Sequence, residues 1–391
     1  MKNKVWLALC ATVIVQGAVA NDHLEVEDGS AVQTNQSTDV NPTQIVTGTP
    51  IVKGMKFSGY AMSQYQYNGN SDKKGNESNY FNLRMVRLSL DGRILNDFAF
   101  KLQAQINGNT SQLGESPRLV DAFVEWQRYD FAKLKIGQFK RAFTFENPMN
   151  PIDQGFMSYA QNIMNLAGFT DRTGEHSSNG RDIGIQLQGD VLKNKFGRAL
   201  LHYQVGVYNG QGINVKDVDN QKDIIGGFWV MPVKGMRLGA FGWTGSYARK
   251  GTDGIKSVAK RRYAVSGEYA ANDWTFRSEY IHSTGLGFVT TYKQSSDLSK
   301  DEINTQKGNK ADGLYALVIA PLATKRLYVK ARYDMYRQSA EWGTSKTFYE
   351  LGVNYLFCKN LQLNMEYAFV NDRSATKHNY NILDAQLSFR F

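Results

Sequence analysis

Basic residues at alternate positions of otherwise apolar stretches are the side chains of this sequence best placed to do chemistry. Six of them are predicted to share a water-facing surface: Lys101, Lys133, Lys135, Arg277, Lys330 and Arg332. Acidic residues occupy equivalent positions at Asp121, Glu125, Glu279 and Asp334. Charges that line a narrow aqueous passage would select ions, because low-dielectric walls focus the field of fixed charges. The acids are also placed to pair with some of these bases and neutralise them.

A second candidate functional region is the long segment from Ala142 to Arg181, which shows no strand periodicity. Its charged residues are Glu146, Asp153, Asp171, Arg172 and Glu175. Many of its other residues are too apolar for a loop in water: Phe145, Met149, Met157, Tyr159, Ile163, Met164, Leu166 and Phe169. Long apolar loops usually have a function, so we expect a constriction that narrows the passage rather than a surface loop. There, four acids against one arginine would repel a dianion.

Catalytic, metal and nucleic-acid sites find little support in the sequence. The histidines are scattered, at His23, His176, His202, His282 and His378, and no metalloprotease or serine-hydrolase motif is present. The run NGQGIN (209–214) enters a loop without a following helix, so it predicts a turn and not a dinucleotide site. Basic residues form no dense patch, which argues against nucleic acid as a partner. We therefore predict no enzyme activity, no cofactor and no metal.

The elements that must position these charges are β-strands. In the stretch Asn379–Phe391, apolar Leu383, Ala385, Leu387 and Phe389 alternate with polar residues. The stretches Phe98–Asn107 and Leu327–Tyr336 repeat this alternation, which gives each strand one apolar and one polar face. Recurrence of this unit over most of a chain is typical of a transmembrane barrel with lipid outside and water inside.

The predicted fold class is therefore all-β: a transmembrane antiparallel β-barrel of about 16 strands, with a long inward-folded third loop. Long polar connections, among them 68–79, 209–222 and 247–260, alternate with short ones, which a soluble β-sandwich would have no reason to maintain. In the second expected strand, about Phe81–Leu90, the apolar alternation changes phase between Met85 and Val86. A bulge near Met85–Val86 would keep the apolar residues on one face. The glycine-rich strands near 223–246 are difficult to phase. A barrel of this size leaves an aqueous channel.

The beginning of the chain predicts export. Residues 1–20 combine Lys2 and Lys4, an apolar core and the small residues Ala18-Val19-Ala20, as a secretory signal peptide does. Cleavage would lower the net charge from +10 to +8 and leave Cys358 as the only cysteine, so no disulfide could form within the chain. Residues 21–54 show no period and predict a flexible periplasmic segment before a barrel over residues 55–391. No later apolar run approaches the roughly 20 residues of a membrane helix.

Four runs resemble the phosphate-selective porin O/P family in their order along the chain: FNLRMVRLSLDGRILNDFAFKLQAQI (81–106), VDAFVEW (120–126), KLKIGQFKRAFTFEN (133–147) and VYNGQGIN (207–214). The resemblance implies an outer-membrane homotrimer of barrels, each narrowed by its third loop. Phosphate-selective members of the family draw anions through with lumen arginines and loop lysines. A terminal strand that ends in Phe391 is also what the barrel-assembly machinery of the outer membrane recognises.

The leading functional hypothesis is a porin for passive diffusion of small hydrophilic solutes and ions, with a weak preference for anions. The acidic constriction segment is the reason that the expected preference is weak. A dedicated phosphate or polyphosphate channel stays open as an alternative. So does a surface adhesin or antigen that uses the barrel only as an anchor.

Overall fold

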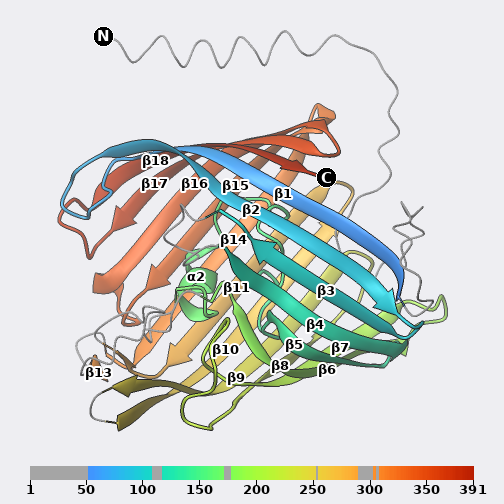
Figure 1. Cartoon of the computed structure of the whole chain (residues 1–391). Coiled ribbons are helices and arrows are strands. Elements are labelled where there is room, and N and C mark those ends of the chain that lie inside the picture. Colours follow the sequence, from blue (N-terminus) through green and yellow to red (C-terminus); the bar gives the residue numbers. More distant parts are fainter. Residues whose placement is uncertain (1–51, 108–116, 171–177, 252–253, 289–302, 305–307) are drawn as a thin grey trace. The chain divides into compact units, whose positions relative to one another are not determined.

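The strands of this chain close into a single antiparallel barrel. The computed structural model describes residues 52–107, 117–170, 178–251, 254–288, 303–304 and 308–391. Sixteen strands follow one another around the barrel in chain order, and the first, β1, pairs with the last, β18 (Figure 1). The predicted fold class and strand number are confirmed.

The three strands that the sequence marks most clearly, Phe98–Asn107, Leu327–Tyr336 and Asn379–Phe391, are observed to within a few residues of these bounds. The barrel strands are β1 (Val52–Asn68), β2 (Ser78–Ile94), β3 (Phe98–Gln105), β4 (Arg118–Tyr129), β5 (Ala132–Lys140), β6 (Arg181–Lys193), β7 (Ala199–Tyr208), β8 (Asp223–Val230), β9 (Met236–Gly251), β10 (Gly254–Ala271), β11 (Trp274–Thr284), β14 (Lys310–Leu322), β15 (Thr324–Arg337), β16 (Ser345–Cys358), β17 (Leu361–Asp372) and β18 (Asn379–Arg390). Outside the barrel, β12 (Gly287–Phe288) pairs with β13 (Ile303–Asn304). The helices among the described residues are α2 (Gln161–Leu166) and η2 (Trp342–Thr344), and both are short. Within the described residues, no helix has the length and apolar composition needed to cross a membrane.

The alternation of β3 shows how the sequence sets the two faces of the wall. Leu102 is 46% exposed on the outer face, whereas Gln103 is 3% exposed on the inner face. Outward apolar residues and inward polar residues recur around the barrel, because the outer surface must be compatible with lipid and the inner surface with water. The facing predicted for β3 is confirmed.

Two bulges change the phase of the wall. The pairing of β1 with β2 passes from Met62↔Met85 to Ser63↔Leu83, so the expected bulge lies at Arg84 and turns Met85 inward. A second bulge in β4 follows from Gln103↔Asp121 next to Ala104↔Leu119. It buries Val120 and leaves Leu119 exposed. A strictly alternating strand would instead have placed Val120 on the same face as Ala122 and Val124, so the bulge reverses its facing.

The connection expected over residues 247–260 is also wrong. Strands β9 and β10 continue through it and pair up to Gly251↔Gly254. Lys250 and Lys256 interrupt the apolar pattern there, but a hairpin can satisfy its backbone hydrogen bonds through the ladder whatever its side chains are. At the other end of the chain β1 begins at Val52, three residues before the predicted start of the barrel at residue 55.

Candidate channel wall and the segment packed against it

The described residues between β5 and β6, 141–170 and 178–180, pack against the polar inner face of the barrel strands. We call them the β5–β6 segment. Its helix α2 contacts β11, β14 and β15 (Figure 1). Its apolar side chains form one buried cluster with Phe241 and Trp243 of β9: Phe143, Phe145, Phe156, Tyr159, Ile163, Leu166 and Phe169. Burial against the wall explains why this segment is more apolar than a loop in water would be.

Glu279 of β11 is the principal anchor of the β5–β6 segment. Its fully buried carboxylate accepts hydrogen bonds from the backbone N–H groups of Phe145 (2.7 Å) and Glu146 (2.8 Å). The hydroxyl groups of Tyr315 (2.8 Å) and Ser266 donate to the same carboxylate. A buried carboxylate is stable only when such donors replace water, so this site selects one position of the segment.

Two more carboxylates hold the backbone of the segment farther along. Asp334 Oδ2 accepts from the N–H of Gln161 at 2.9 Å, at the start of α2. Glu366 Oε1 accepts from the N–H of Met157 at 2.8 Å. These acids come from β15 and β17, so anchoring extends over a large part of the wall.

Basic side chains of the wall bind the carbonyl groups of the same segment. Lys330 Nζ donates to the carbonyl oxygen of Gly155 (2.8 Å), and Arg332 donates to that of Ser158 (2.9 Å). Arg277 donates to Gln154 O (3.3 Å), and Arg262 donates to Leu166 O (2.7 Å). The wall thus satisfies both the donors and the acceptors of this backbone, as a buried irregular chain requires.

Gly155 marks a close approach of the segment to the wall. Its φ is +93°, and a Cβ added there would lie 2.3 Å from Cδ1 of Ile319 on β14. Any larger residue would be strained at this φ, and the end of the Ile319 side chain would have to move to make room for it. The glycine permits the contact between the Gly155 carbonyl and Lys330.

Each of the six bases predicted to line the passage has a carboxylate neighbour. The pairs are Lys101–Asp91 (3.1 Å), Lys133–Asp190 (3.9 Å), Lys135–Glu125 (3.4 Å), Arg277–Glu268 (2.5 Å), Lys330–Glu366 (2.5 Å) and Arg332–Glu350 (2.5 Å). Among the acids expected as partners, Glu125 does pair with one of these bases. Asp121 instead pairs with Arg181, while Glu279 and Asp334 bind backbone N–H groups of the segment. The positive charge of all six bases is locally compensated.

The acids of the β5–β6 segment are also engaged. Glu146 is 1% exposed, and its Oε1 accepts from the N–H of Ala160 at 2.8 Å. Asp153 accepts from Arg390, near the end of β18, at 2.8 Å. Asp171, Arg172 and Glu175 lie outside the described residues. Glu146 therefore acts within the fold of the segment and presents no free charge to water.

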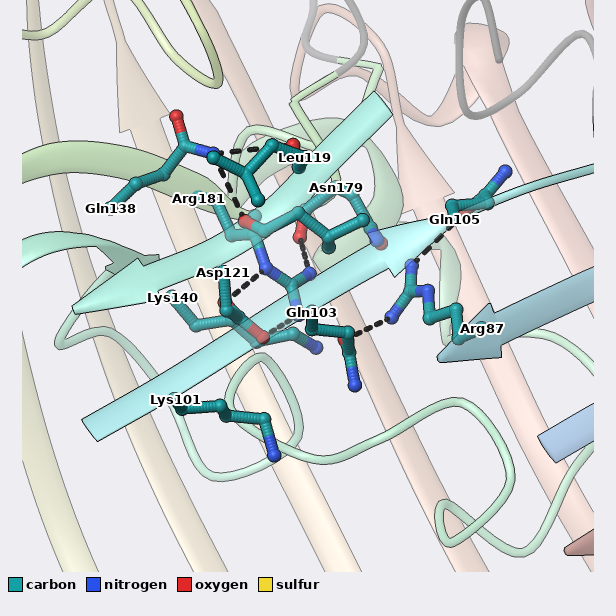
Figure 2. A network of polar contacts seen from close by, with 12 residues as sticks. Arg87, Lys101, Gln103, Gln105, Leu119, Asp121, Gln138, Lys140, Asn179 and Arg181 are labelled. Carbon is teal, nitrogen blue, oxygen red and sulfur yellow. Dashed lines mark hydrogen bonds and ion pairs between the residues drawn. The ribbon is translucent and has the colours of Figure 1, made fainter. Parts of the chain in front are cut away.

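A group of bases that the sequence analysis did not single out lies on the wall from β2 to β6 (Figure 2). Arg181 forms a two-point ion pair with Asp121, with Nε–Oδ1 at 2.6 Å and NH2–Oδ2 at 2.9 Å. Arg87 donates to the side-chain oxygens of Gln103 and Gln105 at 3.5 Å. The group comprises Arg87, Arg118, Lys140 and Arg181. Arg87 could have been found, because it stands between the outward Val86 and Leu88, whereas Arg118 adjoins the bulge in β4 that breaks the period.

Lys140 of this group fastens the beginning of the β5–β6 segment. Its Nζ donates to the carbonyl oxygens of Asn147 (2.7 Å) and Met149 (2.6 Å), and to the hydroxyl of Tyr159 (2.9 Å). Burial raises the pKa of the Tyr159 phenol, so its proton stays in place to bond the Met149 carbonyl. Lys140 and Tyr159 thereby hold the Asn147–Met149 backbone against the part of the segment that contains Tyr159.

Replacing Glu279 should loosen the segment without removing any of it. In a Glu279→Ala variant the buried N–H groups of Phe145 and Glu146 lose their acceptor, at a cost of about 1–3 kcal/mol each. We expect a lower free energy of unfolding in urea and larger current fluctuations in single channels. Glu125→Ala is the matched control, because Glu125 is a buried wall carboxylate bound to Lys135 and Gln188 instead of the segment. Equal fluctuations in both variants would contradict the anchoring role.

Comparison with known proteins agrees with this geometry. Residues 57–223 match the family model of the phosphate-selective porins O and P. No curated protein matches the sequence. Solved structures that resemble the chain include an anion-selective porin from Comamonas acidovorans, with TM-score 0.62 and 13% identity over 86% of this chain and 99% of that chain. OmpF of Salmonella typhi in complex with daunomycin gives TM-score 0.58 and 13% identity over 86% and 97%.

A third resemblance is to a loop L8 deletion mutant of OmpT from Vibrio cholerae, with TM-score 0.55 and 14% identity over 86% of this chain and 99% of that chain. Identities this low establish the fold alone. The family match covers β1 to β7 and the connections between them. The chain is thus a closed sixteen-stranded barrel, and its residues 57–223 match the model of the phosphate-selective porin O and P family.

Proposed function

We propose that this chain is an outer-membrane porin through which small hydrophilic solutes and ions diffuse passively, with a weak preference for anions. The observation that carries the proposal is the pairing of all six predicted pore bases with carboxylates. A strong phosphate site needs several bases whose charge and donors are available to the ligand. Paired bases provide a polar wall instead, which favours general permeability.

The group of bases on β2 to β6 supports the sign of the preference. Arg87, Arg118, Lys140 and Arg181 come from neighbouring parts of one wall, where Asp121 pairs with Arg181. Fixed charges act within a Debye length, about 8–10 Å at ordinary salt, so an ion passing near this wall is influenced by their sum. Basic groups gathered on one part of the wall favour anions, and the paired bases on the rest of the wall keep this preference weak.

The β5–β6 segment is the proposed constriction. It packs on wall residues from β9, β11, β14, β15 and β17, so it occupies cross-section that a bare barrel of this size would leave to water. The sequence suggested that acids of this segment would repel anions at the narrowest point. Glu146 and Asp153 instead accept hydrogen bonds from other groups of the protein. The weak preference therefore rests on paired wall bases more than on repulsion by this segment.

Phosphate sensitivity separates this proposal from the alternative of a dedicated phosphate or polyphosphate channel. In planar bilayers with a KCl gradient, we expect a reversal potential that shows a modest preference for chloride. Millimolar phosphate should then produce little block of the chloride current. Steep, saturable block at sub-millimolar phosphate would establish the dedicated channel, and absence of any conductance would favour a barrel-anchored adhesin.

Location and assembly follow from the same proposal. We place the barrel in the outer membrane, exported by the signal peptide and inserted by the assembly machinery that recognises Phe391, with no catalytic role. One of the structurally similar proteins, OmpT of Vibrio cholerae, was solved in a trimer form. A homotrimer is the corresponding expectation here, and cross-linking of the protein in native membranes followed by gel electrophoresis tests it.

A further inference from the structure

Three neighbouring turns between β4 and β9 are fastened to one another at one end of the barrel. The N–H of Asp190 donates to the carbonyl oxygen of Asp130 at 2.9 Å, which joins the end of β6 to the β4–β5 turn. Arg198 donates to the carbonyl oxygens of Met231 (2.5 Å) and Pro232 (3.1 Å), which joins the β6–β7 turn to the β8–β9 turn. We call residues 130–131, 192–198 and 231–235 the short-turn platform.

The central turn of the platform has a fixed conformation. Asn194 Oδ1 accepts from the N–H groups of Phe196 (2.9 Å) and Arg198 (3.0 Å). Gly197 adopts a φ of +78°, which a glycine takes at little cost, and its N–H donates to the Asn194 carbonyl at 2.9 Å. Lys195 and Phe196 are therefore held at the tip of a rigid turn.

The platform exposes a group of large apolar side chains. Phe131, Leu192, Phe196 and Val233 are each more than half exposed. Large exposed apolar groups on a rigid surface mark a contact with another apolar phase or molecule. They continue the rows of outward apolar residues that cover the same strands, such as Leu187, Val205 and Phe228. The apolar surface of the platform is thus an extension of the face that meets lipid.

Lysines stand directly beside these apolar side chains. Lys193 donates to Asp130 at 3.0 Å, and this hydrogen bond lowers the pKa of the Asp130 carboxyl, so that pair is internally neutral. Lys195 and Lys234 are exposed, and within the described residues neither forms an ion pair. The Lys195 ammonium lies 5.0 Å from the centre of the Phe196 ring, next to its apolar neighbour. The platform therefore carries uncompensated positive charge among groups that favour an acyl layer.

We propose that the short-turn platform binds the headgroups of anionic phospholipids in the leaflet that meets this end of the barrel. Apolar side chains enter the acyl boundary while lysines contact the headgroup phosphates, the combination by which interfacial segments select anionic lipid. Continuity with the lipid-facing rows favours lipid over a protein partner. The inference does not depend on conduction by the channel, so it stands or fails separately from the proposed function.

Lipid retention by native mass spectrometry tests the proposal. The full-length protein is extracted from nanodiscs of phosphatidylcholine mixed with phosphatidylglycerol, and the bound lipids are counted. The unaltered protein is expected to retain phosphatidylglycerol preferentially. In the Lys195→Gln/Lys234→Gln variant, the ratio of bound phosphatidylglycerol to phosphatidylcholine should fall about fivefold for each lysine removed. The matched control, Lys73→Gln/Lys74→Gln, changes two exposed lysines of the connection between β1 and β2 at the opposite end, and should retain the preference.

A second variant separates the apolar contribution from the charge. Phe196→Ser should reduce retention of both lipids while the ratio between them changes little. High salt should weaken the preference for phosphatidylglycerol, because the Debye length falls from about 10 Å at 0.1 M to about 3 Å at 1 M. Equal retention of the two lipids by the unaltered protein would overturn the proposal. Unchanged retention of phosphatidylglycerol by the double-lysine variant would also overturn it. If that variant instead lost a co-purifying protein, the platform would be a protein-docking surface and the proposal would be wrong.

Discussion

Replacing Asn150–Phe169 by a short glycine-serine linker is expected to raise the single-channel conductance clearly. This part of the β5–β6 segment includes α2 and lies against the wall through Gly155, Met157 and Gln161. Without it, the wall side chains that hold it would face water, and the aqueous cross-section would increase. Planar-bilayer recording of purified protein measures the change. A shift in gel mobility on heating shows that the barrel itself has folded.

The control for this experiment shortens an exposed connection between two strands instead of the buried segment. Residues 338–344, between β15 and β16, include η2 and are partly to fully exposed. Their removal should leave the conductance unchanged. An unaltered conductance after removal of Asn150–Phe169 would place the segment outside the path of the ions. The bonds to Glu366 and Asp334 would then serve the stability of the barrel alone.

A charge placed on the outer face should have the largest effect on stability. Leu102 lies in the middle of β3, paired with Leu90 of β2 and Ala122 of β4, and its side chain points outward. A Leu102→Arg variant is expected to lose roughly 2–4 kcal/mol, the cost of a cationic side chain near the bilayer midplane. Urea unfolding in lipid vesicles, followed by tryptophan fluorescence, measures the loss.

The neighbouring residue supplies the comparison. Lys101 faces inward and pairs with Asp91 at 3.1 Å, with both side chains partly exposed to water. Exposed pairs contribute about 0–1 kcal/mol, so Lys101→Ala should change the free energy of unfolding very little. Similar losses in the two variants would mean that β3 is displaced by one residue from its observed register.

The sequence alone was sufficient to predict the strands, their number and the faces of the regular ones. A membrane barrel requires alternation in every strand, so the pattern of Phe98–Asn107 or Asn379–Phe391 can be recognised without knowledge of the neighbours. The bulge in β2 was predictable for the same reason. The apolar period changes phase between Leu83 and Val86, and a bulge is the local irregularity that keeps both residues on the outer face. The bulge at Val120 left no such trace, because both Leu119 and Val120 suit the outer face.

The partners of the charged residues were decided by tertiary structure. Alternation places Lys330 and Glu279 on the inner face, but the register between strands and the path of the β5–β6 segment determine what each of them contacts. Glu279 binds backbone N–H groups contributed by residues more than a hundred positions away, a relation with no local signature. Local sequence periodicity therefore defines the wall of this barrel, while long-range packing defines which of its charges are compensated and which remain to act on an ion.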